Sequence, residues 1–271
     1  LLPRPASESA TLGSETGTVS EAERPDIEEQ AIWALGNIAG DSASCRDKIL
    51  ATRGLAALVH LLKGHDKGLL MSLQRTATWT LSNLCRGKPA PAVATIRPAL
   101  PCLTDLLKST DNETAADACW ALSYLMDEGS PERVHEVLVA GDTHTCVVGT
   151  ALQAARLRLD IARLSHGRVG SSSPFPDSLD VEVLARVSAH IVAGQVAPRL
   201  AALLYHDATI VLTAALAAVA HITAGTKAHQ KVVIDCVGWG GLRWLLAHRK
   251  ARVKMDTCTV ISRIVTGANA Q

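Results

Sequence analysis

The chain has 271 residues, with 27 Lys and Arg against 26 Asp and Glu, and a formal net charge of +1. This balance argues against a nucleic-acid-binding protein, which would need a basic excess on one face. Hydrophobic residues make up 48% of the chain but aromatic residues only 3%. Such a composition is typical of repeat proteins, in which Ala, Leu, Val and Ile pack in thin layers between neighbouring helices.

Residues 1–24 are rich in Ser, Thr, Glu, Gly and Pro and show little apolar periodicity. We expect them to form a disordered lead-in. The chain begins with Leu1 rather than Met, which favours a fragment or a processed form. It contains no 18-residue apolar run and no signal-peptide pattern, so we expect a protein of the cytoplasm and nucleus that has no membrane partner.

Seven cysteines are scattered through apolar segments without a C-x-x-C pair. Their context favours small buried core residues in a reducing compartment over metal ligands or disulfides. These cysteines are Cys45, Cys85, Cys102, Cys119, Cys146, Cys236 and Cys258.

From residue 25 onward the sequence predicts a repeating set of three helices: a short one, an apolar one and a long one. The first set covers 43–52, 55–63 and 70–84, and the second covers 91–98, 100–108 and 113–126. Gly40, Gly87 and Gly129 follow the long helices and are predicted to end them in the left-handed conformation.

The repeat is interrupted after residue 141. Ala217 follows Trp120 by 97 positions, and removing the 53 positions of 142–194 leaves 44, which restores the period. We therefore expect 142–194 to be an insertion of loop or extra helices, with a loop at 167–178. An appended or disordered excursion is favoured over a functional lid. Helical repeats are predicted again in 195–271, through segments 208–224, 227–236, 242–248 and 253–266.

Three similar pentads lie in the long helices: Trp33-Ala-Leu-Gly-Asn37, Trp79-Thr-Leu-Ser-Asn83 and Trp120-Ala-Leu-Ser-Tyr124. The tryptophans are 46 and 41 residues apart, a period that predicts stacked helical units of the armadillo or HEAT kind. Within each pentad the Trp and the residue four positions later share one helical face. Stacking the units aligns these pairs into a ladder.

The ladder predicts a binding surface for an extended basic peptide. Helices about 8–10 Å apart leave slots between the Trp rings for Lys or Arg stems, and the charge gains a cation–π contact. The Asn side chains offer a donor and an acceptor to the peptide main chain. Asp41 and Asp117 place carboxylates near the ladder. Each Trp alone is more simply a core residue and each Asp an ordinary solvated acid, but three pentads in register favour binding.

The segments 29–41, 78–89 and 117–124 closely resemble importin-α, the nuclear-import adaptor. The resemblance is strong over 26–141 and moderate over 195–271. It implies an all-α, right-handed armadillo-repeat superhelical solenoid whose concave groove binds Lys/Arg-rich nuclear localisation signals. It also implies a set of peptide-binding residues: Gln30, Trp33, Asn37, Gly40, Asp41, Trp79, Asn83, Asp117, Trp120 and Tyr124.

The chain departs from the family pattern in two places. Where the family has an Arg and an Asn in the next repeat, this chain has Ala217 and His221, and where it has Trp and Asn one repeat later, this chain has Thr259 and Arg263. We expect the family's second, minor peptide site to be lost. Residues 1–24 also lack the family's Arg-rich importin-β-binding segment, so importin-β is a doubtful partner, and the chain is expected to be a divergent, truncated member.

Two other functions remain open on the sequence. One is a non-importing armadillo scaffold or degenerate paralogue that keeps the fold but does not recruit importin-β. The other is an enzyme, which is disfavoured because the histidines are spread over different repeats without a recognisable catalytic motif. We expect no catalytic residues, no metal site and no cofactor.

Overall fold

The computed structural model describes residues 24–64, 70–127, 130–140 and 196–269. All regular elements in this described part are helices, and none of these helices is long and apolar enough to cross a membrane. The calls for 1–23, for Gly129 and for the 142–194 insertion lie outside the described residues. The division of the chain into domains therefore stays a prediction.

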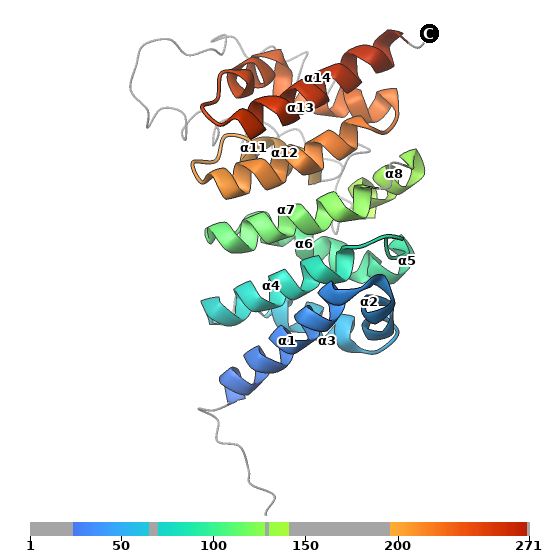
Figure 1. Ribbon diagram of the computed structural model, residues 1–271, viewed down its shortest axis with the longest axis vertical. Helices are drawn as coiled ribbons and strands as arrows, with labels where there is room; N and C mark the ends of the chain where they lie inside the picture. Colours follow the sequence, from blue (N-terminus) through green and yellow to red (C-terminus); the bar gives the residue numbers. More distant parts are fainter. Residues whose placement is uncertain (1–23, 65–69, 128–129, 141–195, 270–271) are drawn as a thin grey trace, which may run out of the picture.

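Five long helices run side by side through the molecule and form one layer (Figure 1). Each contacts the next, and we call them the ladder helices. They are α1 (Arg24–Asp41), α4 (Met71–Cys85), α7 (Asn112–Met126), α12 (Thr209–Thr223) and α14 (Ala251–Asn269).

The other helices form a second layer, which lies behind the ladder helices and, for α2, α5 and α8, at their right-hand ends (Figure 1). Within each repeat one of them packs on its own ladder helix: α3 on α4, α6 on α7, α11 on α12 and α13 on α14. The second layer consists of α2 (Ala43–Leu50), α3 (Gly54–Lys63), α5 (Val93–Ile96), the 3₁₀ turn η2 (Arg97–Ala99), α6 (Leu100–Leu106), α8 (Pro131–Ala140), α11 (Val196–Leu203) and α13 (Lys227–Leu246).

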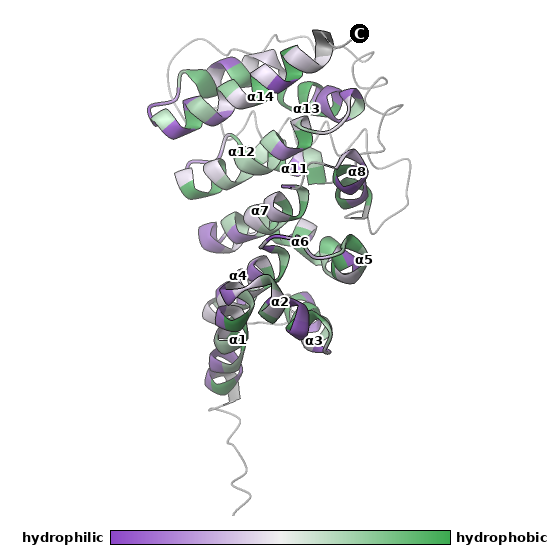
Figure 2. Cartoon of the chain, turned by 45° about the vertical axis from the view of Figure 1, so that its right-hand side comes forward, coloured by the Kyte–Doolittle hydropathy of each residue, from purple (hydrophilic) through white to green (hydrophobic). Residues whose placement is uncertain are grey.

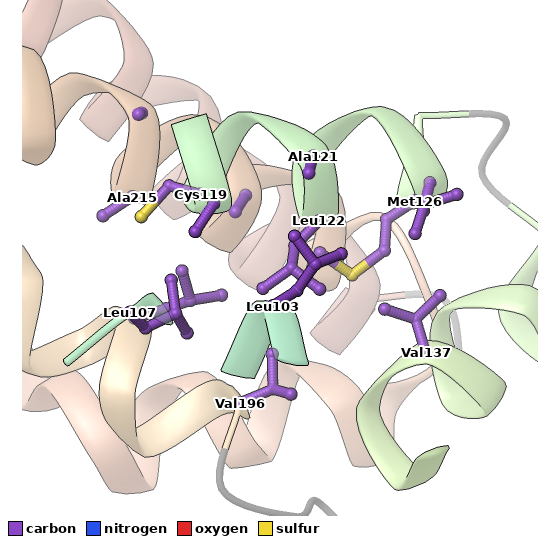
Figure 3. Close-up of a cluster of buried hydrophobic side chains, with 14 of the residues drawn as sticks. Leu103, Leu107, Cys119, Ala121, Leu122, Met126, Val137, Val196 and Ala215 are labelled. Atoms are coloured by element: carbon purple, nitrogen blue, oxygen red, sulfur yellow. The ribbon is translucent and has the colours of Figure 1, made fainter. Parts of the chain in front are cut away.

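Small and branched apolar side chains fill the space between the layers. Figure 3 shows Leu103 of α6, Leu122 of α7 and Val196 of α11 in one buried cluster, so the core continues from the first repeats into the last ones. Figure 2 shows hydrophobic and hydrophilic positions mixed along every helix, as expected of amphipathic helices that bury one side. The all-α armadillo-type arrangement predicted from the Trp period is confirmed.

Two predictions about the backbone need correction. Gly40 lies inside α1 and has no positive φ, so it does not end its helix as predicted, whereas Gly87 follows α4 with a φ of 106°. The predicted helices at 227–236 and 242–248 are joined in α13, which bends at Gly238. There the φ of 70° and ψ of 159° need a residue without Cβ.

Candidate functional site

Residues spaced four, three and four positions apart share one side of each ladder helix. We call this set the ladder face. It consists of Asp26, Gln30, Trp33 and Asn37 in α1; Ser72, Thr76, Trp79 and Asn83 in α4; Glu113, Asp117, Trp120 and Tyr124 in α7; Ile210, Ala214, Ala217 and His221 in α12; and Arg252, Asp256, Thr259 and Arg263 in α14.

The side chains of the first two tryptophans differ in exposure and packing. Trp33 is 55% exposed, whereas Trp79 is half-buried against Gly36 of α1. A Cβ on Gly36 would lie 2.3 Å from Cζ3 of Trp79. Glycine within a helix lowers stability by about 0.5–1 kcal/mol relative to Ala. The close approach of the Trp79 indole explains why a glycine nevertheless occupies position 36. The sequence analysis did not give Gly36 a role, although a mid-helix glycine signals a close contact.

The two asparagines already use part of their hydrogen-bonding capacity within the protein. Asn37 donates from Nδ2 to the carbonyl of Trp33 at 3.0 Å, and Asn83 donates from Nδ2 to the carbonyl of Gly36 at 3.2 Å. Asn37 is exposed, but Asn83 is only 6% exposed and packs on Gly40. Asn83 is part of the ladder face, and its hydrogen bond also links α4 to α1. The sequence analysis did not predict this second role.

The third pentad forms an aromatic pair. The rings of Trp120 and Tyr124 stack with centroids 5.9 Å apart and planes 21° apart. The guanidinium of Arg86, just after α4, lies 6.0 Å from the centre of the Tyr124 ring. Arg86 was not predicted as part of the site, and its proximity depends on the chain path after α4.

Carboxylates gather on the side of the ladder where α7 begins. Asp111 caps α7 by accepting from the Thr114 amide at 3.0 Å, and it pairs with Arg75 at 2.6 Å. Glu113 lies 3.4 Å from the same guanidinium. Hydrogen bonding to Arg75 lowers the pKa of Asp111 to about 2.

Among the described residues, no cation forms an ion pair with Asp117. Its burial, followed by the charges of Glu113 and Asp111, raises its pKa to about 6. At neutral pH the ionised carboxylate of Asp117 therefore adds a negative charge to the ladder face beside Trp120. Asp41, the other carboxylate predicted near the ladder, is exposed and accepts from Sγ of Cys45 at 3.6 Å.

In the last repeats a polar side chain occupies the fourth ladder-face position of each helix, which we call the rung, but the third position has no aromatic ring. His221 lies 3.1 Å from Oγ of Ser123 in α7 and 3.2 Å from Oδ1 of Asp127, the residue that follows α7. Arg263 donates to the carbonyl of Ala220 in α12. Ala217 and Thr259 stand where the first repeats have Trp.

The structure thus lines up the predicted residues on α1, α4 and α7, with Gln30 exposed and Gly40 acting as a contact surface for Asn83. Within the described ranges, no group of three His, Cys, Asp or Glu side chains could hold a metal ion. None of the six described cysteines forms a disulfide. Cys85, Cys102 and Cys119 are buried as predicted, whereas Cys45 and Cys236 are half-buried and Cys258 is exposed, contrary to the prediction of buried core residues. Cys146 lies outside the described residues.

Several known proteins are similar to this chain in sequence or structure. A family model described as a HEAT-like repeat matches residues 71–125. Importin subunit alpha-2 of Arabidopsis thaliana is 53% identical over 116 residues, which is 43% of this chain and 21% of that protein. Among solved structures, a designed armadillo repeat protein in complex with the peptide (KR)4 aligns with 90% of this chain and 100% of that chain, at 18% identity and a TM-score of 0.44.

A longer alignment covers most of the chain. Importin subunit alpha-1a of Oryza sativa subsp. japonica is 36% identical over 247 residues, which is 91% of this chain. The chain spans 36% of that relative and thus about a third of its length. By sequence, the chain is homologous to importin subunit alpha proteins over 91% of its length.

Proposed function

We propose that the ladder face of α1, α4 and α7 binds an extended Lys/Arg-rich peptide, and that this peptide is the nuclear localisation signal of a cargo protein. The observation that carries the proposal is the alignment of three Trp with carboxylates on adjacent helices. The ladder-face residues of these three helices include Asp26, Glu113 and Asp117 but no Lys or Arg.

The chemistry of the face suits a cationic side chain. Lys or Arg stems would pack along the half-exposed indoles, with a cation–π contact worth about 0.5–2 kcal/mol each. Adjacent helices lie about 8–10 Å apart, and an extended peptide advances about 3.3 Å per residue, so every third residue would meet a new slot. Arg86 over Tyr124 supports this mode of contact within the chain itself.

The role as a nuclear import adaptor rests on the relatives, which are named importin subunit alpha. Because the chain spans only part of their length, we propose that it supplies the signal-binding part of such an adaptor, acting between cytoplasm and nucleus. In this role it binds cargo and catalyses no reaction. Recruitment of importin-β is not part of the proposal.

Fluorescence anisotropy with a labelled Lys-rich signal peptide tests the proposal. We expect saturable binding that weakens as salt rises, because the carboxylates on the face are partly exposed. A control peptide with its Lys replaced by Ala should not bind. Equal affinity for both peptides would refute the proposed function and leave a scaffold without signal recognition.

A further inference from the structure

The ladder face changes sign along the molecule. Its charged residues in α1, α4 and α7 are all acidic, whereas α14 contributes Arg252, Arg263 and a single acid, Asp256. Asp256 is already paired with Arg252 at 2.8 Å. The second half of the face therefore has Arg263 as its uncompensated charge.

Arg263 holds a rung position while keeping most of its donors. One of its terminal nitrogens donates to the carbonyl of Ala220, in the same register in which Asn83 donates to Gly36. A guanidinium has five N–H donors, and no carboxylate in the described part of the chain forms an ion pair with Arg263. The half-buried guanidinium is thus fixed in place with donors left for a ligand.

The groups beside α12 leave the positive charge of Arg263 in excess. Lys88, which is exposed, lies 3.4 Å from Oδ2 of Asp127, and Asp127 also faces His221. The pKa of His221 is lowered, first by burial and then by the charges of Arg263 and Lys88, although Asp127 opposes this shift. Lys88 balances Asp127, so the positive charge of Arg263 prevails around the last two rungs.

We propose that the face formed by Lys88, His221 and Arg263, which we call the basic rungs, binds an acidic segment of the same peptide whose Lys/Arg cluster lies on α1, α4 and α7. This inference rests on the proposed function. One step from α7 to α12 is about 10 Å and two steps to α14 about 20 Å, or about three and six extended residues. The Asp or Glu residues therefore belong about three to six positions from the residue at Trp120.

Anisotropy titrations with flanked peptides test this. Each peptide carries one Lys-rich cluster and a three-residue spacer, followed or preceded by four Glu or, as its partner, four Gln. We expect the Glu peptide to bind about 3- to 10-fold more tightly than its Gln partner in one of the two orders, as for one or two partly exposed ion pairs. Equal affinities in both orders would overturn the inference and leave the proposed function intact.

The matched variants are Arg263→Asn and Arg97→Asn. Asn is the residue that fills this rung in α4, so Arg263→Asn should keep a donor to Ala220 while removing the charge. It should abolish the gain from Glu and leave the Gln peptide unaffected. Arg97 is exposed, pairs with Glu136 and is not part of the ladder face, so its variant should keep the gain. A gain that persists in Arg263→Asn would overturn the inference.

Two further measurements test the basic rungs independently of the proposed function and of the stability of Arg263→Asn. A peptide of six Glu without Lys should bind weakly to the wild-type chain and lose this binding in 0.5 M salt and in Arg263→Asn, whether or not the Lys cluster binds. If Arg263→Asn lowers the melting temperature strongly, Lys88→Ala replaces it, because Lys88 is 74% exposed. Binding of the Glu peptide that neither variant weakens would count against the basic rungs.

Discussion

The first three ladder helices and the last two share a scaffold but differ in the chemistry of their exposed face. In both regions the rung residue contacts the preceding ladder helix: Asn83 at Gly36, His221 at Ser123 and Arg263 at Ala220. The ring position differs, since Trp33, Trp79 and Trp120 give way to Ala217 and Thr259. The polar contact between neighbouring ladder helices is thus present in both regions, whereas the ring that the proposed peptide site requires is present only in the first.

The core explains why the two regions can diverge. Fully buried Ala118, Leu122, Ala215 and Leu216 pack between α7 and its neighbours with no part in the ladder face. Because burial of apolar surface stabilises the stack, changes in the exposed positions alter the ligand chemistry without loss of the fold.

Removing the rings should produce the largest effect. Changing both Trp33 and Trp79 to Ala should weaken binding of a single-cluster basic peptide by about 2–4 kcal/mol, because each loses stem packing and a cation–π contact. Isothermal titration calorimetry on the double variant measures this change. Unchanged affinity would mean that the ladder does not bind the peptide.

Trp239→Ala is the matched control for Trp33→Ala. Both tryptophans are 55% exposed, but Trp239 lies on α13, away from the ladder face. Its removal should leave affinity unchanged. Trp33 is also the cleaner test of the pair, since the contact of Trp79 with Gly36 links it to stability as well.

Restoring a ring in the second region should produce the next largest effect. The wild-type chain should bind a peptide with two basic clusters no more tightly than its single-cluster half, because Arg263 repels the second cluster. Combining Thr259→Trp with Arg263→Asn adds a ring at an exposed position and removes the cation. The variant should then bind the two-cluster peptide about tenfold more tightly than the single-cluster one, or about 1.4 kcal/mol. A tenfold preference already present in the wild-type chain would contradict this.

Sequence periodicity was sufficient to predict the helices and the alignment of the pentads, because both depend on spacing along the chain. It could not reveal contacts between repeats. Asn83 was predicted to serve the peptide, but its amide also holds α1, and Gly40 was predicted as a cap but forms the surface beneath Asn83. Arg86 reaches Tyr124 only because the chain turns after α4, which no helical period encodes.

Replacing Asp117 with Asn should raise the stability of the fold but weaken peptide binding. Its pKa of about 6 in the folded protein lies above the ordinary Asp value of 3.8, so the folded protein becomes less stable relative to the unfolded chain as pH rises from about 4 to 6. Asp117→Asn removes this cost and should stabilise the fold by about 1 kcal/mol at pH 7.5. Thermal melts at pH 7.5 and pH 4 measure it, and the difference from wild type should shrink at pH 4.

The same variant should bind the basic peptide about threefold less tightly at pH 7.5, because a partly exposed ion pair is lost. In the wild-type chain affinity should rise as pH increases through about 6, where the carboxyl ionises. Asp117→Asn should flatten this rise. Variants that lose stability and affinity together would show that Asp117 is a structural residue instead.

Deleting residues 142–194 should have the smallest effect. The nearest ladder helices before and after this segment, α7 and α12, pack directly on each other, and His221 contacts Ser123 and Asp127 across the pair. Joining Gly141 to Gln195 should therefore keep the helical circular dichroism signal and the melting temperature within a few degrees, as surface insertions usually permit. A second deletion that carries a six-residue Gly-Ser linker controls for strain at the junction. If both deletions unfold the chain, the segment is part of the core, and the predicted division into two repeat regions with an insertion is wrong.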